Sequence, residues 1–253
     1  MVNETRGHGT SSSKVFGRTL EWKPCPLFLS KVRFNRMNQK TFYRTEDSWT
    51  VPAQFAAFQE LVSSLEKRYG LSLDPEGFYR NPDNYKFTLY PDFFLGYMGL
   101  FTSALLSGRD DFVKITPRFD KDYSVEFLGG KDGFTQRKGG GAETLFYEEI
   151  LEIYAESGIK AEQLPDDYYL KGRYSMATIR NLDKPNLPKA LLVHDGTDGA
   201  LACLLAPMTS ELVVINLREG RYLPRLGGYA KSKKFDLAVV ISSPAAIEFL
   251  KKI

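Results

Sequence analysis

The last third of the chain holds the pattern that most constrains its fold. Three short apolar runs, KALLVH at Lys189–His194, ELVVIN at Glu211–Asn216 and DLAVVIS at Asp236–Ser242, are separated by segments long enough for a helix. Short continuous apolar runs are typical of strands that are buried on both faces of a parallel sheet. Strands that alternate with helix-length segments predict right-handed βαβ units. We therefore predict an α/β protein in which these three runs lie parallel in one sheet.

Upstream segments supply the elements expected to flank this sheet. Thr50–Tyr69 is predicted to be a helix, because Thr50 can cap it, its apolar residues recur at helical spacing and Gly70 follows. Phe112–Thr116 and Ser124–Leu128 are strand candidates. Prolines and glycines predict turns over 71–92, and a glycine- and lysine-rich loop is expected over Gly129–Gly141. Further helices are expected over 143–157, 200–208 and 244–252.

Composition places the chain among ordinary globular proteins. Its 253 residues are 43% hydrophobic and 26% charged, which is enough apolar material for a real core. Residues 1–40 are polar and predict a flexible N-terminal segment, followed by one domain over 41–253. Basic and aromatic residues interleave between Lys31 and Phe42, but a net charge of +3 is too small to favour nucleic acid as a partner.

Membrane and export signals are not visible in the sequence. No run approaches the roughly 18 uninterrupted apolar residues of a membrane span. The opening residues, MVNETRGHGTSSSK, contain no apolar core of a secretory signal. We therefore expect no transmembrane segment in this chain, and the sequence leaves its location open.

The chain also lacks the residue patterns of metal and cofactor sites. His8 and His194 are its two histidines, and Cys25 and Cys203 are far apart, so no metal site is expected. Two glycine-containing segments, Gly139–Gly141 and Asp195–Gly199, could each present backbone amides to a phosphate. Neither has the spacing GxxxxGK[ST] or GxGxxG, so no nucleotide cofactor is expected.

The turn that follows Lys189–His194 lies where many α/β hydrolases place a nucleophile. A residue there is at the carboxyl end of a parallel strand, where open α/β sheets bind ligands. Backbone amides at the start of the next helix can hold an oxyanion. In this chain the turn is His194, Asp195, Gly196 and Thr197, and it contains no serine.

Two stretches resemble the alginate O-acetyltransferase-like SGNH hydrolase family. Lys189–Pro207 resembles its segment of strand, Gly-Asp-Ser-Phe turn and helix, with Asp195 at the family's aspartate and Gly196 where the nucleophilic serine stands. Phe42–Thr50, FYRTEDSWT, resembles its Tyr-Tyr-Lys-Thr-Asp-x-His-Trp-Thr signature. The resemblance covers about residues 41–253. It implies an SGNH/flavodoxin-like parallel sheet that is flanked by helices.

The same resemblance implies that the catalytic positions are substituted. The family's catalytic aspartate falls on Glu46 and its catalytic histidine on Ser48. A Ser-His-Asp mechanism needs a hydroxyl nucleophile and an imidazole base. Ser48 cannot act as a base near neutral pH, and Gly196 has no side chain to acylate. A rearranged site would have to use nearby candidates, which are Asp47, His194, Asp195 and Thr197.

Three hypotheses about function follow. We expect a degenerate, non-catalytic member of the family whose cleft binds carbohydrate or a partner in polysaccharide acetylation. The first alternative is an O-acetyltransferase or acetyl-esterase with a rearranged active site, and the second is a basic-aromatic interaction protein unrelated to the family. Family members are usually extracytoplasmic, although no signal peptide is visible here. The resemblance also predicts that Glu46, Asp47 and Ser48 face the turn 195–198 across a cleft.

Overall fold

The computed structural model describes residues 41–102, 107–128, 134–147, 151, 168–170, 174–196, 199–219, 229 and 232–241. All of them lie in the compact unit Phe34–Ile253. Some expectations concern positions outside these residues. They are the flexible segment 1–40, the candidate Thr197 and the expected helix over 244–252.

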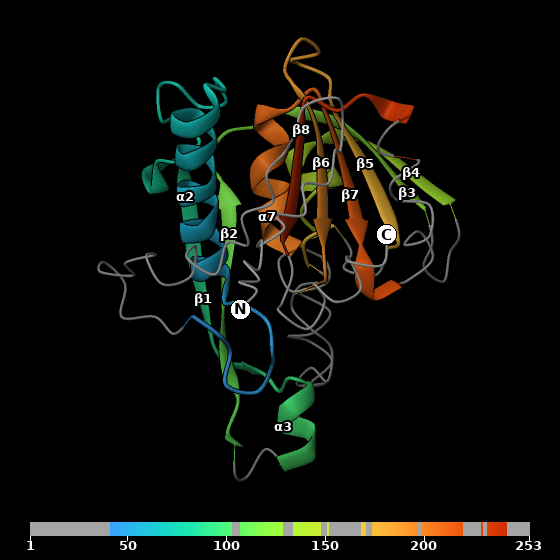
Figure 1. The fold of residues 1–253 in the computed structure, drawn as a ribbon. Helices are drawn as coiled ribbons and strands as arrows, with labels where there is room; N and C mark the ends of the chain where they lie inside the picture. The colour runs from blue at the N-terminus through green and yellow to red at the C-terminus, as the bar shows by residue number, and fades with distance from the viewer. Residues whose placement is uncertain are drawn as a thin grey trace, which may run out of the picture. The chain divides into compact units, whose positions relative to one another are not determined.

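A six-stranded mixed sheet carries the fold (Figure 1). Its strand order is β4-β3-β5-β7-β6-β8. The strands are β3 (Asp122–Leu128), β4 (Phe134–Gly140), β5 (Met176–Asn181), β6 (Lys189–His194), β7 (Glu211–Asn216) and β8 (Leu237–Ile241).

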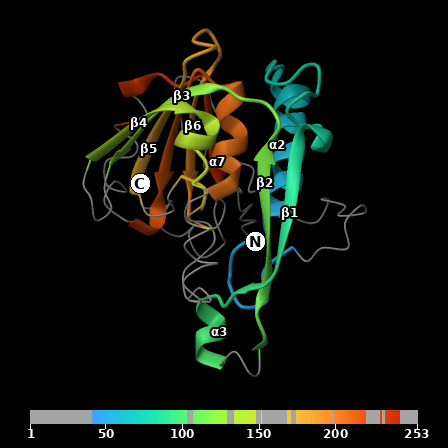
Figure 2. The ribbon, with the colours of Figure 1, turned by 180° about the vertical axis from the view of Figure 1, so that it is seen from behind.

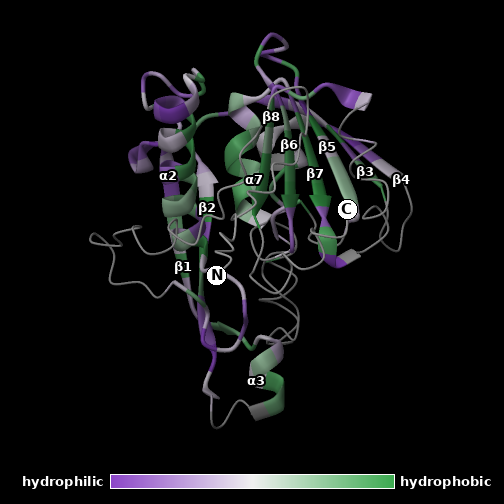
Figure 3. Cartoon of the chain, in the orientation of Figure 1, coloured by the Kyte–Doolittle hydropathy of each residue, from purple (hydrophilic) through white to green (hydrophobic). Residues whose placement is uncertain are grey.

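The three C-terminal strands form the parallel part of the sheet, as predicted. β6 pairs in parallel with β7 on one side and with β8 on the other. The helix α7 (Gly199–Leu205) and the 3-10 helix η3 (Ala206–Met208) connect β6 to β7, which gives the expected βαβ unit. Figure 3 shows hydrophobic residues along α7 and along the central strands. The side chains of these strands are apolar and buried, which is why continuous apolar runs in the sequence predicted the strands correctly.

The expectation of a wholly parallel sheet is wrong for the other half. β5 pairs antiparallel with β7 and β3, and β3 pairs antiparallel with β4. β4 lies within Gly129–Gly141, where the sequence predicted a loop. It is an edge strand and contains Arg137, Lys138 and two glycines. Charged edge strands resist pairing with other chains, and this polar composition made β4 look like a loop.

A separate two-stranded hairpin is formed by β1 (Tyr85–Phe94) and β2 (Asp110–Pro117). β2 and β3 contain the two predicted strand candidates. The sequence missed β1, because Pro91 and the preceding turn formers favoured irregular structure. The register shifts between Tyr90 and Phe94, and Asp92 has φ 46°, so an irregularity of the strand accommodates this proline.

The helix α2 (Val51–Tyr69) forms as the sequence predicted. The Thr50 side chain accepts a hydrogen bond from the Ala53 N–H at 3.4 Å, and Gly70 ends the helix with φ 67°. The apolar stripe of α2 is buried in the core; its members include Val51, Phe55, Phe58, Val62 and Leu65.

α2 lies beside α7 in both ribbon views (Figures 1 and 2). Gln54, which is fully buried, joins the two helices through its side-chain amide. Its Nε2 donates to the Trp49 carbonyl at 3.1 Å, and its Oε1 accepts from the Ala200 N–H at 3.0 Å. One side chain therefore ties the start of α2 to the start of α7.

The remaining described elements are short. They are the 3-10 helices η1 (Pro82–Asn84) and η4 (Leu217–Glu219) and the helices α3 (Tyr97–Thr102) and α5 (Gly141–Thr144). The helix expected over 143–157 is wrong at its start, because α5 ends at Thr144 and Phe146 forms a bridge with Tyr169 instead. Residues 148–150 and 152–160 lie outside the described residues.

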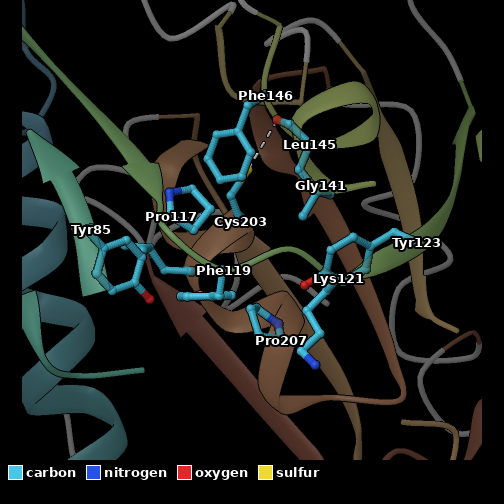
Figure 4. Close-up of a pocket in the computed structure, with 11 residues that line it drawn as sticks. Tyr85, Pro117, Phe119, Lys121, Tyr123, Gly141, Leu145, Phe146, Cys203 and Pro207 are labelled. Atoms are coloured by element: carbon cyan, nitrogen blue, oxygen red, sulfur yellow. Dashed lines mark hydrogen bonds between the residues drawn. The ribbon is translucent and has the colours of Figure 1, made fainter. Parts of the chain in front are cut away.

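Figure 4 shows a gap in the core among Tyr85, Phe119, Tyr123 and Cys203. Its volume is about 10 Å³, which is room for one water molecule at most. The buried Cys203 thiol donates to the Leu145 carbonyl at 3.5 Å. This gap is therefore part of the packing and not a ligand site.

None of the helices in the described part of the chain is both long enough and apolar enough to cross a membrane.

We expect Gln54→Leu to lower the free energy of unfolding by about 1–3 kcal/mol, because the buried Ala200 N–H and the partly buried Trp49 carbonyl lose their partner. Denaturant unfolding measures this change. Gln136→Leu is the matched control, since Gln136 is exposed on β4 and the same substitution there should cost less than about 0.5 kcal/mol. Equal effects of the two substitutions would contradict the role given to Gln54.

Candidate functional site

The segment 41–50, which carries the second signature of the resemblance, folds back on itself as a tight loop. Phe42 and Trp49 form an antiparallel bridge. The Tyr43 N–H donates to the Ser48 carbonyl at 3.2 Å, and the Thr50 N–H donates to the Thr41 carbonyl at 3.0 Å. We call this segment the signature loop. Its backbone hydrogen bonds hold residues 44–47 at its tip.

The carboxylate of Asp110, at the start of β2, holds the tip in place. Its Oδ1 accepts from the Arg44 N–H at 2.9 Å. Its Oδ2 accepts from the Thr45 N–H at 2.7 Å and from the Thr45 hydroxyl at 2.6 Å. Asp110 is buried, so these hydrogen bonds offset the cost of removing its charge from water. The signature loop is thereby fixed to the β1–β2 hairpin.

The start of α3 packs directly onto the same tip. The Gly96 N–H donates to the Thr45 Oγ1 at 2.8 Å, and the Gly99 N–H donates to the Thr45 carbonyl at 3.1 Å. A Cβ at Gly96 would lie 2.3 Å from the Thr45 carbonyl oxygen, which is too close for any side chain. Glycine is therefore required here by the close approach of two backbones.

Glu46 is a buried carboxyl of the signature loop. Its Oε2 accepts from the Tyr97 N–H at 2.7 Å, and its Oε1 accepts from the Asp47 N–H at 3.2 Å. Burial raises the pKa of Glu46, and a side-chain hydrogen bond with Asp47 raises it further. The two backbone donors lower the pKa only in part. Glu46 therefore holds its proton more tightly than an exposed glutamate does.

Asp47, the next residue, is exposed and pairs with Arg218. The Arg218 Nη2 lies 3.3 Å from each oxygen of the Asp47 carboxylate. Burial on its own would raise the pKa of Asp47, but the hydrogen bond with Glu46 and the charge of Arg218 lower it overall. Because both side chains are largely exposed, the pair contributes little to stability. It does, however, connect the signature loop to the sheet.

Gly196 lies at the carboxyl end of the parallel strands. Its N–H donates to the His194 Nδ1 at 3.2 Å, and its φ of 87° is in the left-handed region. A Cβ added at Gly196 would lie 3.0 Å from the Arg218 Cδ and 3.4 Å from the Asn216 Oδ1. A side chain at position 196 would therefore begin in tight contact with the alkyl part of Arg218, which would have to move by a few tenths of an ångström.

The structure places Asp47 and Gly196, two residues that the sequence singled out, beside the same side chain, that of Arg218. Arg218 contacts Asp47 with its guanidinium and faces Gly196 with its methylenes. Ser48, in contrast, is buried, and its Oγ has no hydrogen-bond partner in the part of the chain that the structure describes. His194 and Asp195 are buried at the end of β6, and Thr197 lies outside the described residues.

Three residues that build this region were missed by the sequence reasoning. They are Arg218, Asp110 and Gln54. A signal for Arg218 was present, because parallel pairing of β6 with β7 sets His194 opposite Asn216 and so brings the residues that follow each strand together. Asp110 and Gln54 act through contacts with segments distant in sequence, for which no local pattern exists.

Within the described residues, no group of three or more His, Cys, Asp or Glu side chains is arranged to hold a metal ion.

Three solved structures have a similar fold. A DHHW family protein from Eubacterium siraeum is 15% identical over 85% of this chain and 64% of its own, with a TM-score of 0.59. Bacillus cereus PatB1 with a sulfonyl adduct is 16% identical over 82% of this chain and 61% of its own, with a TM-score of 0.59. PatB1 in a second structure is 15% identical over 82% and 63%, also with a TM-score of 0.59.

These similarities show a shared α/β fold and no more, since identity is so low. The chain spans between 61% and 64% of the length of these proteins. No protein-family model matches the chain, and no curated protein matches it.

We expect Glu46→Gln to change how stability depends on pH. Because the pKa of Glu46 is raised on folding, its proton stabilises the folded state below the ordinary value of 4.5, and this contribution is lost as the pH rises through the raised value. Glutamine does not titrate, but its amide nitrogen cannot accept one of the two backbone N–H groups that the carboxyl oxygens accept. The stability of the variant relative to the wild type should therefore rise as the pH rises above about 4.5, in addition to a pH-independent cost of the lost hydrogen bond.

Urea unfolding at several pH values measures this difference. Glu60→Gln on the exposed face of α2 is the control, since water solvates that carboxyl whether the chain is folded or not. A pH-independent difference between Glu46→Gln and the wild type would show that Glu46 does not titrate abnormally.

Proposed function

We propose that this chain is a non-catalytic binding protein built on an SGNH-like acyl-transfer fold. The resemblance of its two signature segments to the alginate O-acetyltransferase-like family supports the proposal, as does the fold shared with PatB1. The parallel β6–α7–β7 unit argues against an unrelated interaction protein. The proposed ligand of the former catalytic cleft is a carbohydrate or a partner in polysaccharide acetylation.

The observation that carries this proposal is the place of Arg218. A similar protein, PatB1, has been captured with a sulfonyl adduct, and sulfonyl groups attach to nucleophilic side chains. The position that resembles the family's nucleophile is Gly196 here, and Arg218 fills the adjoining space. The site therefore offers no nucleophile, and a side chain at position 196 would have to displace Arg218 by a few tenths of an ångström.

The carboxyl groups nearby are also poorly suited to act as a general base. An efficient base has a pKa near the working pH. The pKa of Asp47 is lowered, and its carboxylate is paired with Arg218. Glu46 has a raised pKa, but it is buried and both of its oxygens already accept backbone hydrogen bonds. Ser48 cannot replace a histidine.

Gln54 occupies one backbone N–H at the start of α7. Backbone N–H groups at the start of a helix after the nucleophile turn can stabilise an oxyanion. Here the Ala200 N–H at the start of α7 is already bound to the Gln54 Oε1 at 3.0 Å. It is not available to a developing negative charge unless Gln54 moves.

We expect the wild-type protein to hydrolyse 4-nitrophenyl acetate no faster than a heat-denatured sample. Gly196→Ser and Gly196→Ser/Ser48→His should remain at this background, because Arg218 still fills the space beside residue 196. Adding Arg218→Ala to the double variant should give measurable turnover. The same triple variant should gain the mass of one sulfonyl group after treatment with phenylmethylsulfonyl fluoride. Wild-type turnover that is lost on His194→Ala or Thr197→Ala would instead support a rearranged enzyme.

We also expect Gly196→Ser to destabilise the protein by about 1–2 kcal/mol, because a residue with a Cβ is strained at positive φ. Thermal or denaturant unfolding measures this loss. Gly141→Ala is the control, because a Cβ there would meet its nearest neighbour, Tyr123, at an ordinary 3.5 Å. A loss for Gly196→Ser no larger than for the control would mean that the turn can relax.

A further inference from the structure

A second region, distinct from the Asp47–Arg218 pair, forms an open cavity of about 320 Å³. It lies between the signature loop, the start of α2 and one side of the β1–β2 hairpin. Pockets that hold small ligands have volumes of roughly 300–1,000 Å³, so this one suits a ligand the size of a single amino acid. We call it the hairpin cavity. The residues used below are Phe42, Arg44, Leu89, Asp92, Arg109 and Asp111.

Opposite charges line the hairpin cavity. Arg109 directly precedes β2 and Asp111 is the second residue of that strand, and both line the cavity. Asp110 between them points to the signature loop, as its hydrogen bonds show. Among the ion pairs formed by described residues, none includes Arg109 or Asp111. The two charges thus face the same space without neutralising each other.

The guanidinium of Arg109 is incompletely hydrogen-bonded. Its Nη1 is buried and has no hydrogen-bond partner in the described part of the chain. A buried donor without a partner is costly, and this Nη1 meets an anionic ligand oxygen when the partly exposed Arg109 side chain turns toward the cavity that it lines. Arg44 lies beside it, because the Arg44 Nη2 donates to the Arg109 carbonyl. The Arg44 guanidinium also packs against Gly108, whose φ is 65° and whose missing Cβ leaves room for it.

A hydrogen bond also fixes the position of an acceptor at the cavity. The Asp111 Oδ1 accepts from the Asp92 N–H at 2.8 Å, which fixes the carboxylate at the irregular part of β1. Asp92 and Asp111 are both exposed at the cavity and can accept from a ligand cation. Two guanidinium groups therefore face two available carboxylates. The Asp110 carboxylate is a third negative charge in the lining, but its oxygens already accept from the signature loop. A simple anion or cation therefore matches only part of the available groups.

The same cavity has an apolar side. Phe42 is 47% exposed and Leu89 is 59% exposed, and both line the cavity. Leu89 is paired with Val113 across the hairpin, so the two lie on one face of it. A ligand that covers these side chains would remove apolar surface from water.

We propose that the hairpin cavity binds a zwitterionic α-amino acid with an apolar side chain. The ligand carboxylate accepts from Arg109 and Arg44, the ligand ammonium donates to Asp111 and Asp92, and the apolar side chain packs on Phe42 and Leu89. This inference is independent of the non-catalytic function proposed above, because it concerns different side chains and no acyl transfer.

The test uses leucine and two analogues that each lack one charge, N-acetyl-leucine and leucinamide. Isothermal titration calorimetry with the full-length chain should detect saturable binding of leucine. Each analogue should bind about tenfold more weakly or worse, since each loses charge-assisted hydrogen bonds. Equal binding of leucine and either analogue would overturn the proposal, and so would the absence of leucine binding. Binding of maltotriose in place of leucine would overturn it in favour of a sugar site.

Two variants assign the charges to residues. In Arg109→Met the advantage of leucine over leucinamide should shrink, because the carboxylate loses one of its two partners. In Asp111→Asn the advantage of leucine over N-acetyl-leucine should shrink for the same reason, while Asn keeps the Oδ1 that accepts from the Asp92 N–H. A loss of folding alone would weaken all three ligands equally, and that result would count against the assignment. Arg68→Met, an exposed change at the end of α2, is the control and should leave all three affinities unchanged.

Discussion

The buried carboxylate of Asp110 is the contact on which both candidate sites depend. It accepts two backbone N–H groups and one hydroxyl from Arg44 and Thr45, and so fixes the signature loop to β2. A buried charge is tolerated when its hydrogen bonds are complete, and losing one partner is costly. The loop then carries Asp47 toward Arg218 on the sheet and Arg44 toward Arg109 on the hairpin. One anchoring carboxylate thus sets the positions of charged groups in two separate places.

The second constraint is the parallel register of β6 and β7. His194 is opposite Asn216, so the turns that follow these strands emerge side by side at the carboxyl edge of the sheet. Gly196 and Arg218 are each two residues beyond that pair, and the Arg218 side chain passes over the glycine. The Arg218 N–H donates to the Asn216 Oδ1 at 3.0 Å, which helps to fix where its side chain starts. The edge that binds ligands in related architectures is here occupied by an arginine.

Local sequence patterns predicted the elements whose stability is local. The helix α2 has its cap, apolar stripe and terminal glycine in one stretch, and β6, β7 and β8 have continuous apolar runs. β1 and β4 were missed, because Pro91 and the glycines of the edge strand have the composition of loops. At the candidate site, the turn after β6 and the family resemblance pointed to Gly196 as the position that corresponds to a nucleophile. Contacts such as Thr45 to Asp110 and Gln54 to Ala200 join residues 65 and 146 positions apart, and nothing near either residue indicates its partner.

The effects of Gly196 and Arg218 on the candidate site depend on each other, so a similar fold does not by itself imply a similar activity. A serine at position 196 would carry a strained backbone and would begin 3.0 Å from an arginine methylene. Without Arg218, on the other hand, Asp47 would lose the cation that lowers its pKa and would become a better proton acceptor. Gly196 supplies no nucleophile, and Arg218 makes Asp47 a poorer base. A substitution at only one of these two positions therefore does not supply both a nucleophile and a base. Similarity to solved structures at this identity shows the α/β fold alone, and under the function proposed above these two neighbouring positions at the strand ends decide whether acyl transfer can occur.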